Sequence, residues 1–129
     1  AHQQLVERVA AELQRAGRLV WTDLALRAGL ARDDEPERLR WAICQPDVYS
    51  LRPSSKPEGL EVAIHEIKVS RADLLGELRR PDKSAAYAAL SGQTWFVLQA
   101  GIASNRSQFS TQTAAPFKSA CAALNSASA

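Results

Sequence analysis

The sequence predicts a single α/β domain with a mixed, mainly central β-sheet. A chain of 129 residues is long enough for one hydrophobic core and too short for two. An amphipathic pattern near the N-terminus indicates a helix, whereas apolar segments at 60–69 and 94–98 indicate strands with helical sequence between them. Hydrophobic residues make up 46% and charged residues 23%, an ordinary globular composition that excludes wholesale disorder.

The N-terminal third is predicted to be mainly helical. From Gln3 to Ala16 the apolar residues recur on one helical face, and Gly17 is a natural end for that helix. The polar pair at 22–23 can cap a short second helix that ends at Gly29. The segment 38–44 is compatible either with a helix opened by the preceding proline or with a strand.

The clearest strand signals form a β-hairpin in the middle of the chain. Asp47–Leu51 and Leu60–Val69 have the character of strands, and the Pro- and Ser-containing stretch 52–59 is the loop between them. Opposed residues in an antiparallel pair have a constant sum of residue numbers. This loop therefore brings Asp47 opposite Glu66, within a one-residue slip or bulge.

A capped helix, its continuation and a last strand complete the domain. Ser70 and Asp73 form a capping box, with Asp in place of the usual Glu, for a helix that stops at Pro81. Helical sequence continues over 82–91. Thr94–Leu98 is apolar after its first residue, as expected for a strand covered on both faces.

The chain divides at residue 102. Residues 1–102 form the predicted α/β domain, and residues 103–129 form a Ser- and Ala-rich tail without acidic residues. We expect this tail to be weakly specified, and a short helix over 116–124 is the one element that its sequence suggests.

Charge, cysteine content and hydropathy exclude several classes of protein. The net charge of +2 is too small to indicate nucleic-acid binding by itself, so such a function must come from a local arrangement. Cys44 and Cys121 lie far apart, which argues against a disulfide framework or a zinc site. No apolar run is long enough to span a membrane, and the first residues lack the pattern of a secretory signal. We therefore expect a cytoplasmic protein without a membrane partner.

An acid and an amine share one face of the clearest strand. Side chains alternate along a strand, so Ile64, Glu66 and Lys68 lie on one face, which begins apolar and ends charged. Two carboxylates on neighbouring strands, Asp47 and Glu66, repel each other unless a cation lies between them. Their hard oxygen atoms suit Mg²⁺ or Mn²⁺. Lys68 could then orient or deprotonate a metal-bound water and offset negative charge during phosphodiester hydrolysis.

This pattern resembles the PD-(D/E)XK nuclease superfamily over residues 46–101. The resemblance is carried by Pro46-Asp47 and Glu66-Ile67-Lys68, and the run 66–74 is similar to the MmcB-like branch, which is associated with DNA repair. It implies a restriction-endonuclease-like α-β-β-β-α-β core with a central mixed sheet flanked by helices. It also implies that Asp47 and Glu66 are metal ligands, that Lys68 is catalytic, and that the backbone carbonyl of Ile67 is a further ligand.

Members of this superfamily often add an acid from the first helix. Glu12 lies closer to the apolar stripe of that helix than Glu7 does, at 100° per residue, and is therefore the better candidate for a further metal ligand.

Four more residues are candidates for binding DNA phosphates. Arg71 shares a predicted helix face with three leucines, so we expect it to point inward beside the free N–H groups that follow Ser70. Lys83 and Tyr87 have the spacing of the Gln-x-x-x-Tyr element of some nucleases in the superfamily, with Lys in place of Gln.

Each candidate also has a simpler interpretation. The segment 22–43 has a superficial helix-turn-helix pattern, although its acids at 33–37 would repel phosphate where a recognition helix would begin. The simpler assignments are a strand-end ion pair for Glu66 and Lys68, a cover for its own helix end for Arg71, and a solvated face for Arg79, Arg80 and Lys83. Tyr87 and Cys44 would be core residues, and the three tryptophans, Trp21, Trp41 and Trp95, would have packing roles. His65, on the opposite face of the strand, would be satisfied or partly exposed.

From these residues we expect a metal-dependent DNA nuclease that acts in DNA repair or mobile-element maintenance. The alternative is a non-catalytic DNA-binding or repair-accessory module that retains the nuclease fold, since a fold does not guarantee a function. A third hypothesis is a structural domain without catalytic activity whose partner is a protein. A net charge of +2 predicts weak nonspecific affinity for DNA, which a homodimer or a repair-protein partner would supplement.

Overall fold

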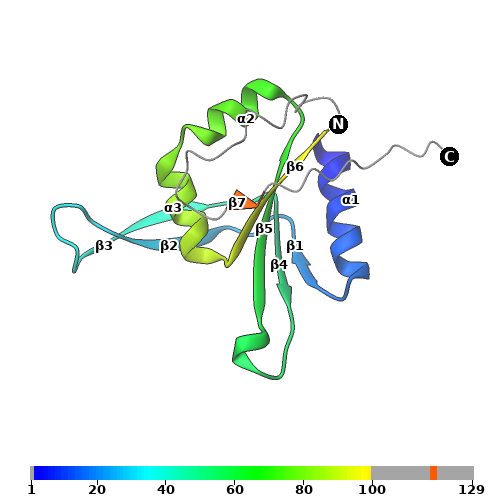
Figure 1. Ribbon diagram of the computed structural model, residues 1–129, viewed down its shortest axis with the longest axis horizontal. Coiled ribbons are helices and arrows are strands. Elements are labelled where there is room, and N and C mark those ends of the chain that lie inside the picture. Colours follow the sequence, from blue (N-terminus) through cyan, green and yellow to red (C-terminus); the bar gives the residue numbers. More distant parts are fainter. Residues whose placement is uncertain (1, 100–116, 119–129) are drawn as a thin grey trace.

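The computed structural model describes residues 2–99 and 117–118. In this part of the chain, helices lie on both faces of a mixed sheet, and a separate β-hairpin extends away from the sheet (Figure 1). The elements are α1 (His2–Arg15), β1 (Leu19–Trp21), β2 (Leu26–Ala31), β3 (Leu39–Cys44), β4 (Val48–Arg52), the 3-10 helix η1 (Pro57–Gly59), β5 (Glu61–Lys68), α2 (Arg71–Leu78), α3 (Pro81–Leu90), β6 (Gln93–Leu98) and β7 (Phe117–Lys118).

The main sheet has the strand order β1-β4-β5-β6-β7. β4 is antiparallel to both β1 and β5, whereas β6 is parallel to β5 and to β7. The predicted α/β class with a mixed central sheet is therefore confirmed. None of the helices in the described residues has the length and apolar character that a membrane crossing requires.

Helix α1 covers one face of the sheet. Val6 and Val9, from its apolar stripe, pack with Ile67 of β5 and with residues of β4 and β6. The helix ends as the sequence predicts, because Gly17 adopts a φ of +85°, a left-handed conformation that favours glycine. Its N–H donates to the carbonyl of Gln14, which closes the last turn.

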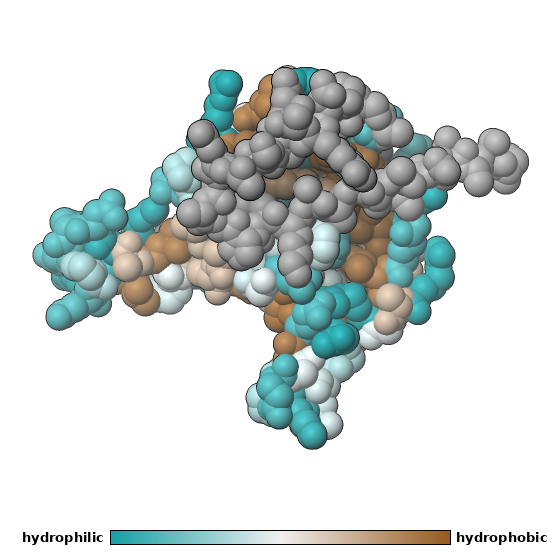
Figure 2. Space-filling model, viewed as in Figure 1, coloured by the Kyte–Doolittle hydropathy of each residue, from teal (hydrophilic) through white to brown (hydrophobic). Residues whose placement is uncertain are grey.

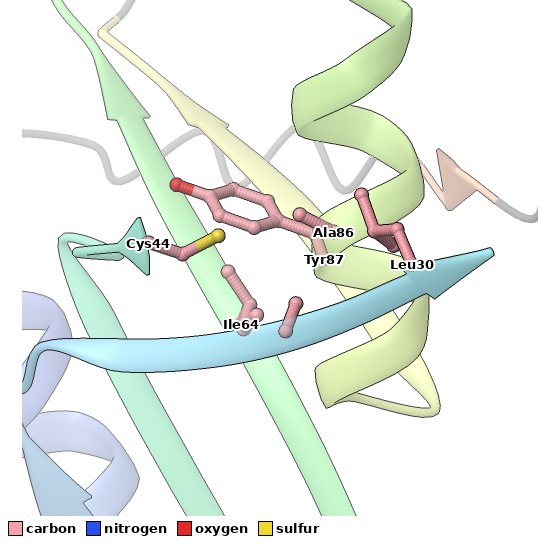
Figure 3. Packing of buried hydrophobic residues seen from close by; sticks show 6 residues of the cluster. Leu30, Cys44, Ile64, Ala86 and Tyr87 are labelled. Atoms are coloured by element: carbon pink, nitrogen blue, oxygen red, sulfur yellow. The ribbon is translucent and has the colours of Figure 1, made fainter. Parts of the chain in front are cut away.

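The opposite face of the sheet is covered by α2, α3 and the β2–β3 hairpin. Ile64 of β5 is fully buried in a cluster with Tyr87 of α3 and Cys44 of β3 (Figure 3). The interpretation of Cys44 as a small core residue is confirmed. Further along the sheet, Leu74 of α2 packs on Phe96.

The second helix predicted before Gly29 is wrong, because residues 26–31 form strand β2. This strand pairs antiparallel with β3 over its whole length, which resolves the ambiguity of segment 38–44 in favour of a strand and excludes the helix-turn-helix interpretation. The physical reason is tertiary: Ala28 and Leu30, which alternate with more exposed neighbours, are buried in the cluster around α3.

The outer face of this hairpin carries apolar residues that the core does not cover. Leu39, Trp41 and Ile43 alternate along β3 and are 53%, 64% and 74% exposed. Trp41 is therefore not part of the core. It packs on the neighbouring strand instead, because its ring lies 3.4 Å from the position that a Cβ on Gly29 would occupy. Figure 2 shows that the far end of the hairpin is hydrophilic.

The central hairpin has the predicted register. Val48 pairs with His65, which places Asp47 opposite Glu66 without a slip or bulge. Ser70 caps α2 as predicted, because its Oγ accepts a hydrogen bond from the backbone N–H of Asp73 at 3.1 Å.

Most of the predicted tail lies outside the described residues. Phe117–Lys118 forms strand β7 beside β6, so the helix suggested over 116–124 is wrong at these two positions, and this part of the tail belongs to the sheet.

Candidate active site

The candidate site lies at the C-terminal end of β5, where Glu66 points away from α1 and toward α3. Only 3% of Glu66 is exposed, which is unusual for a carboxylate and requires polar partners. Those partners come from the residue that precedes β4, from α3 and from β5 itself. Elements distant in the sequence therefore converge on one buried acid.

Two hydrogen bonds join Asp47 to Glu66 and Ile67 of β5. The backbone N–H of Asp47 donates to Glu66 Oε1 at 3.2 Å, and the N–H of Ile67 donates to Asp47 Oδ2 at 2.8 Å. Pro46, which is fully buried, fixes the chain just before Asp47. The predicted proximity of the two acids is thus produced by the strand register and strengthened by direct bonds.

The ammonium groups of Lys68 and Lys83 alternate with the carboxylates of Glu66 and Glu77. Lys68 Nζ lies 3.6 Å from Glu66 Oε2 and 3.5 Å from Glu77 Oε2. Lys83 Nζ lies 3.4 Å from Glu66 Oε2 and also contacts Glu77. We call this closed, charge-balanced cluster the Lys–Glu ring. The ion pair of Glu66 with Lys68 exists, but it is buried rather than exposed at a rim.

Lys83 and Tyr87, one turn apart on α3, both contact Glu66. The hydroxyl of Tyr87 donates to Glu66 Oε1 at 2.7 Å. Burial, followed by the charge of Glu66 and the hydrogen bond to it, raises the pKa of Tyr87 far above its usual range, so the hydroxyl remains a donor. Burial alone would lower the pKa of Lys83, but the hydrogen bond to Glu77 and the charge of Glu66 outweigh it and raise the pKa. The solvated-face interpretation of Lys83 is therefore wrong.

Glu77 and His2 belong to the site and were not predicted. Glu77 comes from the last turn of α2, and His2 Nε2 lies 3.4 Å from Asp47 Oδ2 at the start of α1. No helical period links Glu77 to Lys83, because the chain turns at 79–80 between α2 and α3. The one available signal is that Glu77 follows the buried Leu74 by three residues, which places it on the flank of the covered face.

The structure does not bring Glu12 to the site. Its side chain is 43% exposed and pairs with Arg8 at 3.6 Å. At 1.5 Å per residue, Glu12 lies about 15 Å along the helix axis from His2, which does contact Asp47.

The inward orientation predicted for Arg71 is wrong. Arg71 is exposed at the first position of α2, and Leu75 on its predicted face is 40% exposed. Of the three leucines predicted to share a face with Arg71, only Leu74 and Leu78 cover the sheet, where they pack against β6. Ser70 uses its Oγ to cap the helix, and a phosphate contact by either residue stays a prediction.

The donor set fits Mg²⁺ or Mn²⁺ better than a metal that requires a full protein cage. No group of three or more His, Cys, Asp or Glu side chains arranged to hold a metal occurs in the described residues. Mg²⁺ typically uses one or two carboxylates and keeps several waters, which Asp47 and Glu66 can satisfy. In a strand the N–H and C=O of one residue face the same neighbour, so the carbonyl of Ile67 also faces the side of Asp47.

Neither the family models, nor the curated proteins, nor the solved structures compared with this chain match it. The chemistry of the site therefore rests on the contacts of Asp47, Glu66, Lys68 and the residues around them.

His65 lies on the face of β5 opposite Glu66 and is partly exposed, as predicted, but one of its ring nitrogens is not satisfied. Its Nδ1 is buried and has no hydrogen-bond partner among the described residues, and its ring stacks on Trp95 with centroids 6.4 Å apart. Burial, and secondarily the positive charge of Arg18, lowers the pKa of His65 to about 4. The folded protein therefore disfavours the protonated imidazole.

This histidine predicts a loss of stability in mild acid. The pKa of His65 is about 4 in the folded protein and 6.5 for an unperturbed histidine. The contribution of neutral His65 to the free energy of unfolding is complete above pH 6.5 and is lost as the pH falls toward 4, because the unfolded chain binds the proton more strongly. Over this range the slope of the free energy of unfolding against pH approaches about 1.4 kcal/mol per pH unit. Urea unfolding at several pH values between 4 and 7 measures it.

His65→Phe is the matched variant, because it keeps a ring against Trp95 and cannot titrate. The slope between pH 4 and 6.5 should decrease in His65→Phe and persist in His2→Phe. An unchanged slope in His65→Phe would assign the acid sensitivity to other groups.

Proposed function

We propose that this protein is a Mg²⁺- or Mn²⁺-dependent DNA nuclease of the PD-(D/E)XK type that acts in DNA repair or mobile-element maintenance. The supporting observation is that Asp47 and Glu66 meet at the same end of neighbouring strands, with Lys68 Nζ 3.6 Å from Glu66 Oε2. Two acids and an amine on a rigid sheet are the groups that metal-assisted phosphodiester hydrolysis uses. The proposal carries the expectation of a cytoplasmic protein with DNA as its partner.

The order of the elements also supports this proposal. Without the β2–β3 hairpin, the chain runs α1, β1, β4, β5, the α2–α3 pair and β6, with the first three strands antiparallel and the last one parallel to β5. With α2 and α3 taken together, this order is compatible with the α-β-β-β-α-β core that the resemblance implies. The hairpin would then be an insertion between the first two core strands.

Each side chain has a defined part in this proposal. Asp47, Glu66 and the carbonyl of Ile67 would hold the metal, which when bound supplies Lewis acidity and lowers the pKa of water. Lys68 places positive charge beside Glu66 and orients the attacking water. Tyr87 and Lys83 are positioning residues, because they fix the carboxylate of Glu66 through hydrogen bonds.

Calorimetric titration with Mn²⁺ tests the metal site. We expect Asp47→Asn to weaken binding by at least about tenfold, because it removes a charged ligand while leaving an oxygen that can accept from the Ile67 N–H. Asp73→Asn is the matched control, since Asp73 is an exposed acid in the first turn of α2. Equal affinities of the wild type and Asp47→Asn would contradict the assignment.

The Lys–Glu ring favours a second candidate, a non-catalytic DNA-binding or repair-accessory module. Two lysines balance two glutamates, so the buried charges already have partners within the protein. For this candidate we expect DNA binding, in a homodimer or with a repair-protein partner, but neither Mn²⁺ binding nor cleavage. The titration of the wild-type protein separates the two candidates.

A further inference from the structure

A pocket of about 310 Å³ lies between the β2–β3 hairpin and α3, next to the candidate site. Its lining includes residues of β3 (Ala42, Ile43 and Cys44) and of α3 (Ala86 and Tyr87). Figure 3 shows part of this arrangement, with Cys44 and Tyr87 entering the same region from β3 and α3. The pocket therefore combines apolar side chains between β3 and α3 with polar residues at Gln45 and at the start of α3.

The charged residues of the pocket come from the start of α3 and from the residue before it. Asp82 is already paired with Arg40 of β3 at 3.0 Å, and Lys83 is paired with the glutamates of the Lys–Glu ring. Arg80 also lines the pocket, is exposed, and forms no ion pair with any residue from 2–99. The positive charge available to a ligand is thus that of Arg80.

Two residues connect this pocket to the candidate active site. Lys83 and Tyr87 line the pocket, and both bind Glu66, Lys83 at 3.4 Å and Tyr87 at 2.7 Å. A ligand held between the hairpin and α3 therefore lies one side chain away from the carboxylate of Glu66.

We propose that this pocket receives one unpaired nucleotide of a DNA strand, with its base between β3 and α3 and its phosphate toward Arg80. A volume of about 310 Å³ is at the lower end of small-ligand pockets, which suits a single nucleotide rather than a base pair. Unpaired bases are commonly held by apolar contacts, with cationic side chains on their phosphates. This inference rests on the proposed function and specifies its substrate class: single strands, flaps or frayed ends.

Fluorescence anisotropy tests this inference with a labelled single-stranded oligonucleotide and a duplex of the same sequence. Both are measured in EDTA, so that no cleavage occurs. We expect the single strand to bind more tightly than the duplex. Arg80→Ala should weaken single-strand binding by about tenfold and reduce the salt dependence by about one phosphate contact. Arg79→Ala is the matched control, because Arg79 is an exposed neighbour that does not line the pocket, and its affinity should stay within about twofold.

Gln45→Glu is a second variant that keeps the side chain's shape, because Gln45 lines the pocket and is exposed. Its carboxylate would add negative charge to the lining, so we again expect a loss of about tenfold in single-strand affinity. Equal effects of Arg79→Ala and Arg80→Ala, or duplex binding as tight as single-strand binding, would overturn the inference.

The proposed function and this inference can be overturned independently of each other. If Mn²⁺ binds and DNA is cleaved but Arg80→Ala behaves like Arg79→Ala, the pocket assignment is wrong and the nuclease proposal stands. If single-strand binding depends on Arg80 and Gln45 but neither metal binding nor cleavage occurs, the pocket assignment stands and the nuclease proposal fails.

Discussion

Glu66→Ala is expected to lower the free energy of unfolding by about 3–5 kcal/mol, because it removes one partner from a buried set of charges. In the variant, Lys68 and Lys83 share only Glu77, and two positive charges remain in a region that excludes water. The hydroxyl of Tyr87 also loses its acceptor at 2.7 Å. Urea unfolding, followed by far-ultraviolet circular dichroism, measures the change.

Two further variants separate the charge from the hydrogen bonds. Glu66→Gln retains an acceptor for Tyr87 and for the Asp47 N–H, so its loss should be smaller than that of Glu66→Ala. Combining Glu66→Ala with Lys83→Met removes one of the unpaired cations and should restore part of the stability. A loss below about 1 kcal/mol for Glu66→Ala would mean that the Lys–Glu ring behaves like an exposed ion pair.

The central hairpin could be predicted because its register is determined locally. The turn at 53–60, one residue later than the predicted loop, sets the centre of the hairpin, and the alternation from Ile64 to Lys68 fixes which residues are buried. Ile64 is fully buried in the core cluster. A one-residue slip would have moved it to the opposite face of the sheet. The position of Asp47 opposite Glu66 followed from that register.

The β2–β3 hairpin could not be predicted because its strands are stabilised by distant partners. The residues at 24–30 have good helix propensity, and nothing within that segment indicates that Ala28 and Leu30 will pack against α3. Pairing with β3 and burial against Ala86 and Tyr87 outweigh the local preference. The inward orientation predicted for Arg71 also failed for a tertiary reason. Its helix face is buried at Leu74, which packs on β6, and not at Arg71 itself.

The candidate site was predicted where one strand pair determines it and missed where tertiary packing does. Asp47, Glu66 and Lys68 follow from the hairpin and the alternation of β5. Glu77 enters only because the chain turns between α2 and α3 and returns Lys83 to the same place. The i,i+4 spacing of Lys83 and Tyr87 indicated a shared face, but their common target, Glu66, depends on how α3 lies over the sheet.

Lys68→Ala is expected to reduce cleavage of supercoiled plasmid by about 10²–10³-fold, with Mn²⁺ binding retained, because it removes positive charge from the place where negative charge develops. Lys68 is on the same strand as Glu66, and its Nζ lies between Glu66 and Glu77, so it is held by the sheet rather than by a loop. Plasmid nicking in Mn²⁺, compared with calorimetry on the same variant, separates the loss of chemistry from the loss of metal.

Lys83→Gln is the matched variant for this experiment. An amide at position 83 can still donate to Glu66, and it reproduces the Gln-x-x-x-Tyr spacing with Tyr87, so we expect cleavage to stay within about tenfold of the wild type. Both variants remove one ammonium group from the Lys–Glu ring, so a general loss of ring charge would affect them equally. Equal loss of cleavage in the two variants would therefore assign the effect to the ring as a whole, whereas a selective loss in Lys68→Ala assigns it to the lysine on β5.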